Sequence, residues 1–135
     1  MKDFLGYNVF DGSFADCADA MAAEIQSGRK KCQIMACLNP HSYIVAKDDT
    51  AFHNALKGVT WLVPDGAGVV IGARILGNPL PGRVTGPDVF EALLERLGPQ
   101  KRSVFFLGSS ASTLAKMSQK MAERFPHVRV AGTYS

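Results

Sequence analysis

One aspartate lies between two apolar stretches, in the segment VTWLVPDGAGVV of residues 59–70. Asp65 follows the apolar run of residues 59–63 and precedes Gly66 and Gly68. A carboxylate at the edge of a partly dry pocket gains affinity for a proton, which suits a general base, and the two glycines leave room for a substrate. Aspartate is also a favoured helix cap, and position alone favours that structural role about two to one. The segment therefore indicates either a catalytic base or a cap at residue 65.

Two other segments, residues 37–40 (CLNP) and 108–110 (GSS), have residue types that could contact an anionic ligand. Asn39 and Ser109 are more typical of helix caps, and Ser109 is only a weak candidate for binding phosphate. Arg83 lies in the loop NPLPGRVTGPD, whose proline and glycine content indicates irregular, exposed chain. For an arginine in such a loop, a solvated surface position is favoured about two to one over a ligand contact. Its guanidinium could nevertheless hold a diphosphate with two parallel hydrogen bonds.

No metal site or cofactor is predicted. The three histidines do not cluster in the sequence, and no carboxylate or cysteine stands at ligand spacing from them. The three cysteines form no CxxC pair, and an odd, scattered set is typical of reduced thiols in a cytosolic protein. If residues 32–38 form a strand, Cys32 and Cys37 point to opposite faces and cannot bridge each other without distortion. Cys17 is the third cysteine.

The elements that position these residues alternate between strands and helices. Continuous apolar runs predict strands at residues 7–10, 32–38, 59–63, 103–107 and 127–131. Helical spacing and caps predict helices at residues 13–28, at 39–56 with a break near 48, at 67–76, from 87 and from 110. The segment 67–76 is apolar nearly all round, which predicts a helix buried inside the domain, and its glycines at 68 and 72 would let another backbone approach.

Alternating strands and helices predict an α/β fold, a Rossmann-like parallel sheet flanked by helices, in one domain over residues 1–135. The sequence ends straight after a strand, where this pattern would continue into a helix, so the fold is expected to be incomplete at its C-terminus. Ligands of parallel sheets bind beyond the carboxyl ends of the strands. We therefore expect the exits at residues 37–40, 64–68 and 108–110 to line one rim, each leading into a helix whose free N–H groups favour an anion.

The composition excludes several classes of protein. The 135 residues are 47% apolar and 20% charged, as in soluble globular proteins rather than disordered ones. A net charge of +3 suits an anionic ligand or membrane surface and is too small to indicate nucleic-acid binding. There is no apolar signal core at the N-terminus and no run of the ~18 residues that a membrane span needs. Any contact with a membrane is therefore expected to be peripheral.

Several segments, taken in order, resemble the WecG/TagA/CpsF family of bacterial glycosyltransferases, whose type reaction is N-acetylmannosaminyl transfer. The resemblance rests on Asn39-Pro40, LVPDGAGVV, ARILG with PGRVTGPD, and VFFLGSS, and it runs from about residue 6 to the end. The specific part is the DGxG element followed by Arg-Val-x-Gly-x-Asp some fifteen residues on. Members of the family are roughly twice as long. The chain is thus expected to be the N-terminal part of a catalytic domain, and to be inactive without the rest.

The resemblance implies an inverting, metal-independent transfer of a sugar from a UDP-sugar to a polyprenyl-diphosphate-linked sugar, at the inner face of the bacterial plasma membrane. It implies that Asp65 is the base. Family members commonly carry threonine where this chain has Cys37, which has a similar size but weaker hydrogen bonding. The expected substrate-contacting residues are Cys37, Asn39, Gly66, Gly68, Arg83, Gly108 and Ser109. An exposed apolar face, or its burial in a homo-oligomer or against the remaining half of the protein, is also expected.

Three alternatives stay open at the level of sequence. The first is a nicotinamide-binding domain, because glycines at 66, 68 and 72 form GxGxxxG after a strand. Against it, Asp65 would point a negative charge towards the pyrophosphate, and Asp88, which stands where the ribose-binding acid is expected, opens a helix. The second is a thiol enzyme that uses Cys37 with His41 one turn on. The third is a non-catalytic binding or scaffolding fragment.

Overall fold

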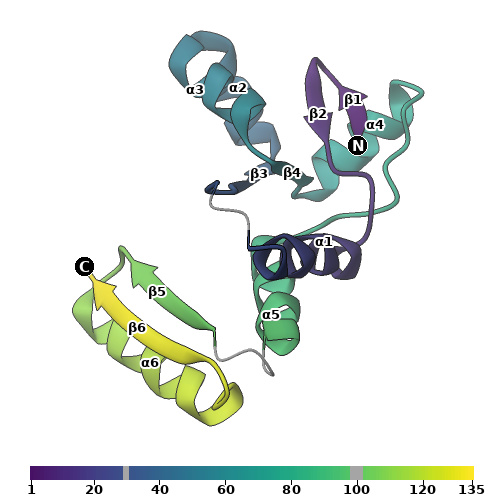
Figure 1. Ribbon diagram of the computed structural model, residues 1–135. Coiled ribbons are helices and arrows are strands. Elements are labelled where there is room, and N and C mark those ends of the chain that lie inside the picture. The colour runs from purple at the N-terminus through teal and green to yellow at the C-terminus, as the bar shows by residue number, and fades with distance from the viewer. Residues whose placement is uncertain (29–30, 98–101) are drawn as a thin grey trace. The chain divides into compact units, whose positions relative to one another are not determined.

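The computed structural model describes residues 1–28, 31–97 and 102–135, in two compact units, Met1–Ala92 and Leu93–Ser135 (Figure 1). The expectation that both belong to one domain stays a prediction. Among the described residues, no helix is both long and apolar enough to cross a membrane.

The first unit contains a four-stranded sheet with the order β1-β2-β4-β3. Strand β4 pairs in parallel with both β2 and β3, and β1 pairs antiparallel with β2. The bounds of these strands are Lys2–Phe4 for β1, Tyr7–Val9 for β2, Met35–Leu38 for β3 and Trp61–Pro64 for β4. The helices are α1 (Phe14–Gln26), α2 (Pro40–Asp48), α3 (Thr50–Gly58), α4 (Ala67–Ile75) and α5 (Gly86–Leu97), of which α5 crosses the boundary between the units.

Helices cover both faces of this sheet because successive strand residues point to opposite sides. On one face Leu62 packs in a cluster with residues of α2, α3 and α4; on the other, Trp61 and Val63 pack with residues of α1 and α5. All of β4 is buried, as the apolar run predicts. The mixed α/β class, with a mostly parallel sheet between helices, is therefore confirmed.

The second unit is a parallel β-α-β arrangement. Strand β5 (Ser103–Leu107) pairs with β6 (Arg129–Tyr134), and α6 (Ala111–Arg124) connects them. Ser110 caps α6 by accepting a hydrogen bond from the backbone N–H of Thr113. The strand at 103–107 agrees with the prediction, whereas β6 begins two residues later than expected and extends to Tyr134.

Local sequence explains where the helices of the first unit begin and end. Ser13 caps α1 in a capping box with Asp16, at the predicted start of this helix. The helical stretch predicted at 39–56 is two helices, and the break falls at Asp49, whose extended backbone ends α2 and whose carboxylate caps α3. Gly28 has a φ of +70° just after α1, which fits a glycine that stops a helix.

One strand was missed in the sequence, and two sequence predictions about elements are wrong. Strand β1 was not predicted, and it forms a hairpin with β2 through Leu5 and Gly6. The strand predicted at 32–38 begins only at Met35, so Cys32 lies outside it and is exposed. Helix α4 is not buried on all sides, because only Val69 and Ala73 are buried.

The exposed side of α4 carries large apolar side chains. Ile75, at 79% exposure, is the most exposed of them, and Ile71 and Leu76 are also more than half exposed. In the second unit Phe105, Leu107 and Tyr134 are likewise more than half exposed. These side chains fit the expectation of an exposed apolar face; what covers them in a larger assembly stays a prediction.

Candidate functional site

Asn39 and Asp65 lie side by side at one edge of the first unit's sheet. Strands β3 and β4 are parallel and in register, with Leu38 opposite Pro64, so the next residue of each chain segment leaves the sheet at the same edge. A backbone hydrogen bond of 2.8 Å from the Asp65 N–H to the Leu38 carbonyl extends the pairing by one step. The backbone alone therefore fixes the position of Asp65, beyond the carboxyl ends of parallel strands, where such sheets bind ligands.

The side chain of Asp65 does not cap the helix that follows it. The N-cap residue of α4 is Gly66, and no side-chain hydrogen bond caps this helix. Asp65 is half-buried, and its carboxylate accepts no hydrogen bond from a described residue. The structural role that position alone favoured is therefore absent. The carboxylate and the first N–H groups of α4 both remain available to a ligand.

Asn39, in contrast, is a helix cap. Its side-chain oxygen accepts a 2.8 Å hydrogen bond from the backbone N–H of Ser42, and its own backbone N–H donates to the Ser42 hydroxyl at 2.9 Å. This capping box begins α2 at Pro40. It uses the carbonyl oxygen of the Asn39 amide but leaves the amide's NH₂ group without a described partner. Asn39 can therefore begin the helix and still donate to a ligand.

Cys37 lies next to Asp65. Burial raises the pKa of the Cys37 thiol, the negative charge of Asp65 raises it further, and a hydrogen bond from the backbone N–H of Gly86 partly offsets both. A Cβ added at Gly86 would lie 3.6 Å from the Cys37 sulfur, so the start of α5 also borders this position. A raised pKa keeps the thiol protonated at neutral pH, which argues against a thiolate nucleophile.

Two glycines let the loop after β4 pack against the start of α2. Gly66 has a φ of +98°, which L side chains rarely adopt. A Cβ added at Gly68 would lie 2.9 Å from Cγ of Pro40, closer than side-chain carbons approach one another. The predicted close approach at Gly68 is thus made by a proline ring and not by another backbone; at Gly72 an added Cβ would lie 3.6 Å from the Phe4 ring.

Arg83 lies in the segment that returns from α4 to the sheet. The backbone N–H of Val84 donates a 2.9 Å hydrogen bond to the carbonyl of Pro64, so this segment runs past the end of β4. Arg83 itself is exposed, as expected of its loop, and it lines a small hollow of about 120 Å³ with Gly12, Ser13 and other residues at the start of α1.

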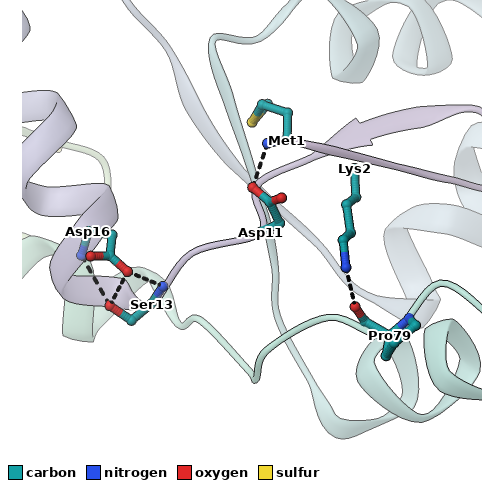
Figure 2. Close-up of polar contacts among 6 residues, drawn as sticks. All are labelled: Met1, Lys2, Asp11, Ser13, Asp16 and Pro79. Carbon is teal, nitrogen blue, oxygen red and sulfur yellow. Dashed lines mark hydrogen bonds and ion pairs between the residues drawn. The ribbon is translucent and has the colours of Figure 1, made fainter.

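Contacts of the N-terminal hairpin hold this region together. Figure 2 shows the Lys2 ammonium donating to the carbonyl of Pro79 at 2.9 Å, which ties β1 to the loop that precedes Arg83. The N-terminal ammonium pairs with Asp11 and lowers the pKa of its carboxyl, chiefly through their hydrogen bond. In the same view Ser13 and Asp16 form the cap of α1.

The start of α1 was missed as part of the candidate site. Strand β2 is parallel to β4, with Val9 opposite Leu62, so its exit meets the same edge as the exits of β3 and β4. The signal was present in the sequence, because Gly12 and Ser13 follow a strand and precede a helix as the other two exits do. The sequence analysis used Ser13 only as the start of the helix predicted at residues 13–28 and did not include Gly12 in a site.

Two of the predicted site residues, Gly108 and Ser109, belong to the second unit. Gly108 and Ser109 follow β5 with φ angles of +92° and +74°, and the Gly108 N–H donates to the Tyr134 carbonyl at 2.7 Å. Ser110, not Ser109, caps α6. The expectation that this exit shares a rim with Asp65 stays a prediction. Among residues 1–28, 31–97 and 102–135, no group of three potential ligands could hold a metal ion.

The fold and this edge define an α/β protein with a candidate site where three parallel strands end. The model of the glycosyl transferase WecG/TagA/CpsF family matches residues 2–135. The chain therefore belongs to the WecG/TagA/CpsF family of glycosyltransferases, as the resemblance implied.

Two curated relatives agree with this assignment. The chain is 29% identical over 104 residues to an N-acetylglucosaminyldiphosphoundecaprenol N-acetyl-β-D-mannosaminyltransferase of Bacillus spizizenii, a match that covers 77% of this chain and 40% of the relative. It is 28% identical over 99 residues to a protein of the same name from Bacillus subtilis, covering 73% of this chain and 39% of the relative. The chain thus spans about two-fifths of the length of these relatives.

Proposed function

We propose that this chain is the N-terminal part of a glycosyltransferase that moves an N-acetylmannosamine-type sugar, or a related hexose, from a UDP-sugar to a polyprenyl-diphosphate-linked sugar. The family membership supports glycosyl transfer over the nicotinamide-binding alternative. The names of the two relatives support a polyprenyl-linked acceptor and a mannosaminyl product in the β configuration. Because the acceptor carries a lipid, we place the protein at the inner face of the bacterial plasma membrane, in peripheral contact.

One observation carries the mechanism. The Asp65 carboxylate lies half-buried at the edge where parallel strands end, is not used as a cap, and has the NH₂ group of Asn39 on the neighbouring segment. In the proposed reaction Asp65 accepts the proton of the acceptor hydroxyl as that oxygen attacks the anomeric carbon. Attack from the face opposite the departing diphosphate inverts the configuration. A positioned general base contributes about 10²–10⁴ in rate.

The leaving diphosphate needs positive charge or hydrogen-bond donors, and we propose that the protein supplies both without a metal. The first turn of α4 has no side-chain cap, so its N–H groups can donate to an anion. Arg83 is exposed on the segment that passes the end of β4 and can add a guanidinium. Cys37, Gly66 and Gly68 border the same space and are proposed to contact the sugar; Gly108 and Ser109 are proposed to contact the nucleotide.

The test is the Asp65→Asn variant of the full-length enzyme, assayed with UDP-N-acetylmannosamine and a polyprenyl-diphosphate-N-acetylglucosamine acceptor. We expect turnover to fall at least about a hundredfold, because asparagine cannot accept the proton. Asp48→Asn, which changes an exposed carboxylate at the end of α2, is the matched control and should leave turnover unchanged. Near-normal turnover of Asp65→Asn, with an unaltered circular dichroism spectrum, would rule out the base. Full activity in EDTA is expected, and loss of activity in EDTA would contradict the metal-free mechanism.

A further inference from the structure

A second hollow lies on the side of the sheet that α2 and α3 cover, away from Asp65. It has a volume of about 350 Å³, at the lower end of the range for small-molecule sites. Residues of three parts of the first unit line it: Leu5 and Tyr7 from the hairpin, Tyr43, Ala46 and Lys47 from α2, and Thr50 and His53 from α3. Lys47 stands eight residues beyond Asn39, which is about 12 Å along the axis of α2. Tyr43 stands only one turn beyond Asn39, but none of the residues proposed to act at the candidate catalytic edge lines this hollow, so the two differ in their lining.

Aromatic rings form the floor of this hollow. The Tyr7 side chain is buried and meets Tyr43 edge to face, with ring centroids 6.3 Å apart, and His53 at 5.2 Å. The Tyr7 hydroxyl and Nδ1 of His53 are joined by a 2.7 Å hydrogen bond. Burial, and to a lesser extent Tyr43, raise the pKa of Tyr7, so its phenol stays protonated and can donate to Nδ1. When the Tyr7 hydroxyl donates, the imidazole hydrogen is on Nε2, which is then a donor; when Nδ1 donates to the hydroxyl, Nε2 of the neutral ring is an acceptor. In both cases Nε2 can pair with a hydroxyl group of a ligand.

Several polar groups at the rim have no partner within the described chain. Tyr43 and His53 are half-buried, and Lys47 and Thr50 are exposed. No described residue makes a hydrogen bond or ion pair with the Tyr43 hydroxyl, the Lys47 ammonium or the Thr50 hydroxyl. Together with the imidazole of His53, these groups belong to four residues that line one hollow with a partly aromatic surface. Convergent polar groups on an apolar floor are characteristic of a small-molecule site.

The local charge disfavours an anion. Lys47 is followed directly by Asp48 and Asp49, and the Asp49 carboxylate caps α3 beside Thr50. The immediate surroundings thus carry one positive and two negative charges. A phosphate would gain one ammonium contact but would be repelled by the two carboxylates. A neutral ligand rich in hydroxyl groups has no such penalty, and its C–H groups can lie against tyrosine rings.

Leu5 adds an apolar edge at an unfavourable conformation. It occupies the first position of the two-residue β1–β2 turn with a φ of +53°, and Gly6 follows with a φ of +82°. Turns with positive φ at both positions favour asparagine, aspartate or glycine, so a leucine there is conformationally costly. The leucine is nevertheless 44% exposed and lines the hollow. An acetamido methyl group would find an apolar contact against it.

We propose that this hollow binds an N-acetylated pyranose, with the sugar ring against Tyr43 and its hydroxyl groups at Lys47, Thr50 and His53. The site is distinct from the one at Asp65 and does not depend on the proposed transfer reaction. Such a site would let the protein hold one sugar unit of a saccharide whether or not the edge at Asp65 acts on another part of the same molecule.

The experiment is a titration of the ¹⁵N-labelled full-length protein with N,N′-diacetylchitobiose, followed by amide chemical shifts. We expect shifts at Lys47, Thr50 and His53, with a dissociation constant on the order of 1 mM. Lys47→Ala should weaken binding about threefold, and Tyr43→Ala about tenfold or more. Lys57→Ala removes an exposed lysine from the last turn of α3 and is the matched control, with no change expected.

Other outcomes overturn the inference. Shifts confined to the residues around Asp65 would mean that the disaccharide binds only at the catalytic edge. Equal binding by Lys47→Ala and Lys57→Ala, or a site occupied as tightly by inorganic phosphate, would exclude the proposed saccharide contacts. Asp65→Asn separates the two proposals, since it should abolish transfer and leave this titration unchanged.

Discussion

Gly68 and Gly72 stand one turn apart in α4, yet their replacement by alanine should have opposite effects on stability. At Gly72 a Cβ would lie 3.6 Å from the Phe4 ring, an ordinary contact, so alanine gains the usual helix advantage of about 0.5–1 kcal/mol. At Gly68 the Cβ would lie 2.9 Å from Cγ of Pro40, at least about 0.6 Å inside the optimal carbon separation. Overpacking against a rigid ring costs about 1–3 kcal/mol, so Gly68→Ala should be destabilising by about 1–2 kcal/mol.

Urea denaturation measures this difference, with Trp61 as the probe. Trp61 is the chain's single tryptophan, is 8% exposed, and lies in β4 just before the loop. The two variants should differ by about 2 kcal/mol in the free energy of unfolding, and thus by about 1 M in urea midpoint. Gly68→Ala should also lower transferase turnover, because relief of the clash moves Asp65 relative to α2. If Gly68→Ala is as stable as Gly72→Ala, the packing described for the loop is incorrect.

Three further predictions concern the first unit. At pH 8 iodoacetamide should label exposed Cys32 first and Cys37 more slowly. Cys17, whose pKa is raised to about 11 chiefly by burial, should react only on unfolding. Mass spectrometry of timed samples gives the order of labelling, and early labelling of Cys17 would contradict it. Ser13→Ala should lower the free energy of unfolding by about 1 kcal/mol in urea titrations through loss of the α1 cap, and an unchanged midpoint would deny the cap that role. Leu5→Asn should raise the free energy of unfolding by about 0.5–1 kcal/mol in urea titrations, because asparagine tolerates a positive φ better than leucine does. A destabilised variant would mean that the packing of Leu5 outweighs the cost of its turn conformation.

Much of the candidate site could be predicted because it depends on local signals. Continuous apolar runs predict β3 and β4 as buried strands of a parallel sheet, whose exits are expected at one rim; the structure pairs the two directly, which brings Asn39 and Asp65 to one edge. Caps are equally local, which is why the start of α1 at Ser13 and the break between α2 and α3 follow from short stretches of sequence.

The remaining features depend on contacts between distant segments. Strand β1 is three residues long, too short for a clear alternation, and its turn places Leu5 where the expected residue is asparagine or glycine. The side chains of α4 are apolar nearly all round, and such a pattern does not reveal which side a neighbour covers. Whether Asp65 caps its helix depended on where the helix begins: α4 starts at Ala67, so Gly66 and not Asp65 is the N-cap residue.

The hydrogen bond between the Val84 N–H and the Pro64 carbonyl closes the intervening segment into a loop whose two ends meet. Within that loop, Val69, Ala73 and Leu80 anchor α4 to the core, while Ile75 and Leu76 do not take part in it. The part of this loop around Ile75 and Leu76 can therefore change in length or in residue type without displacing the strand β4 that positions Asp65. Related enzymes could diversify there in what they touch while the chemistry stays the same.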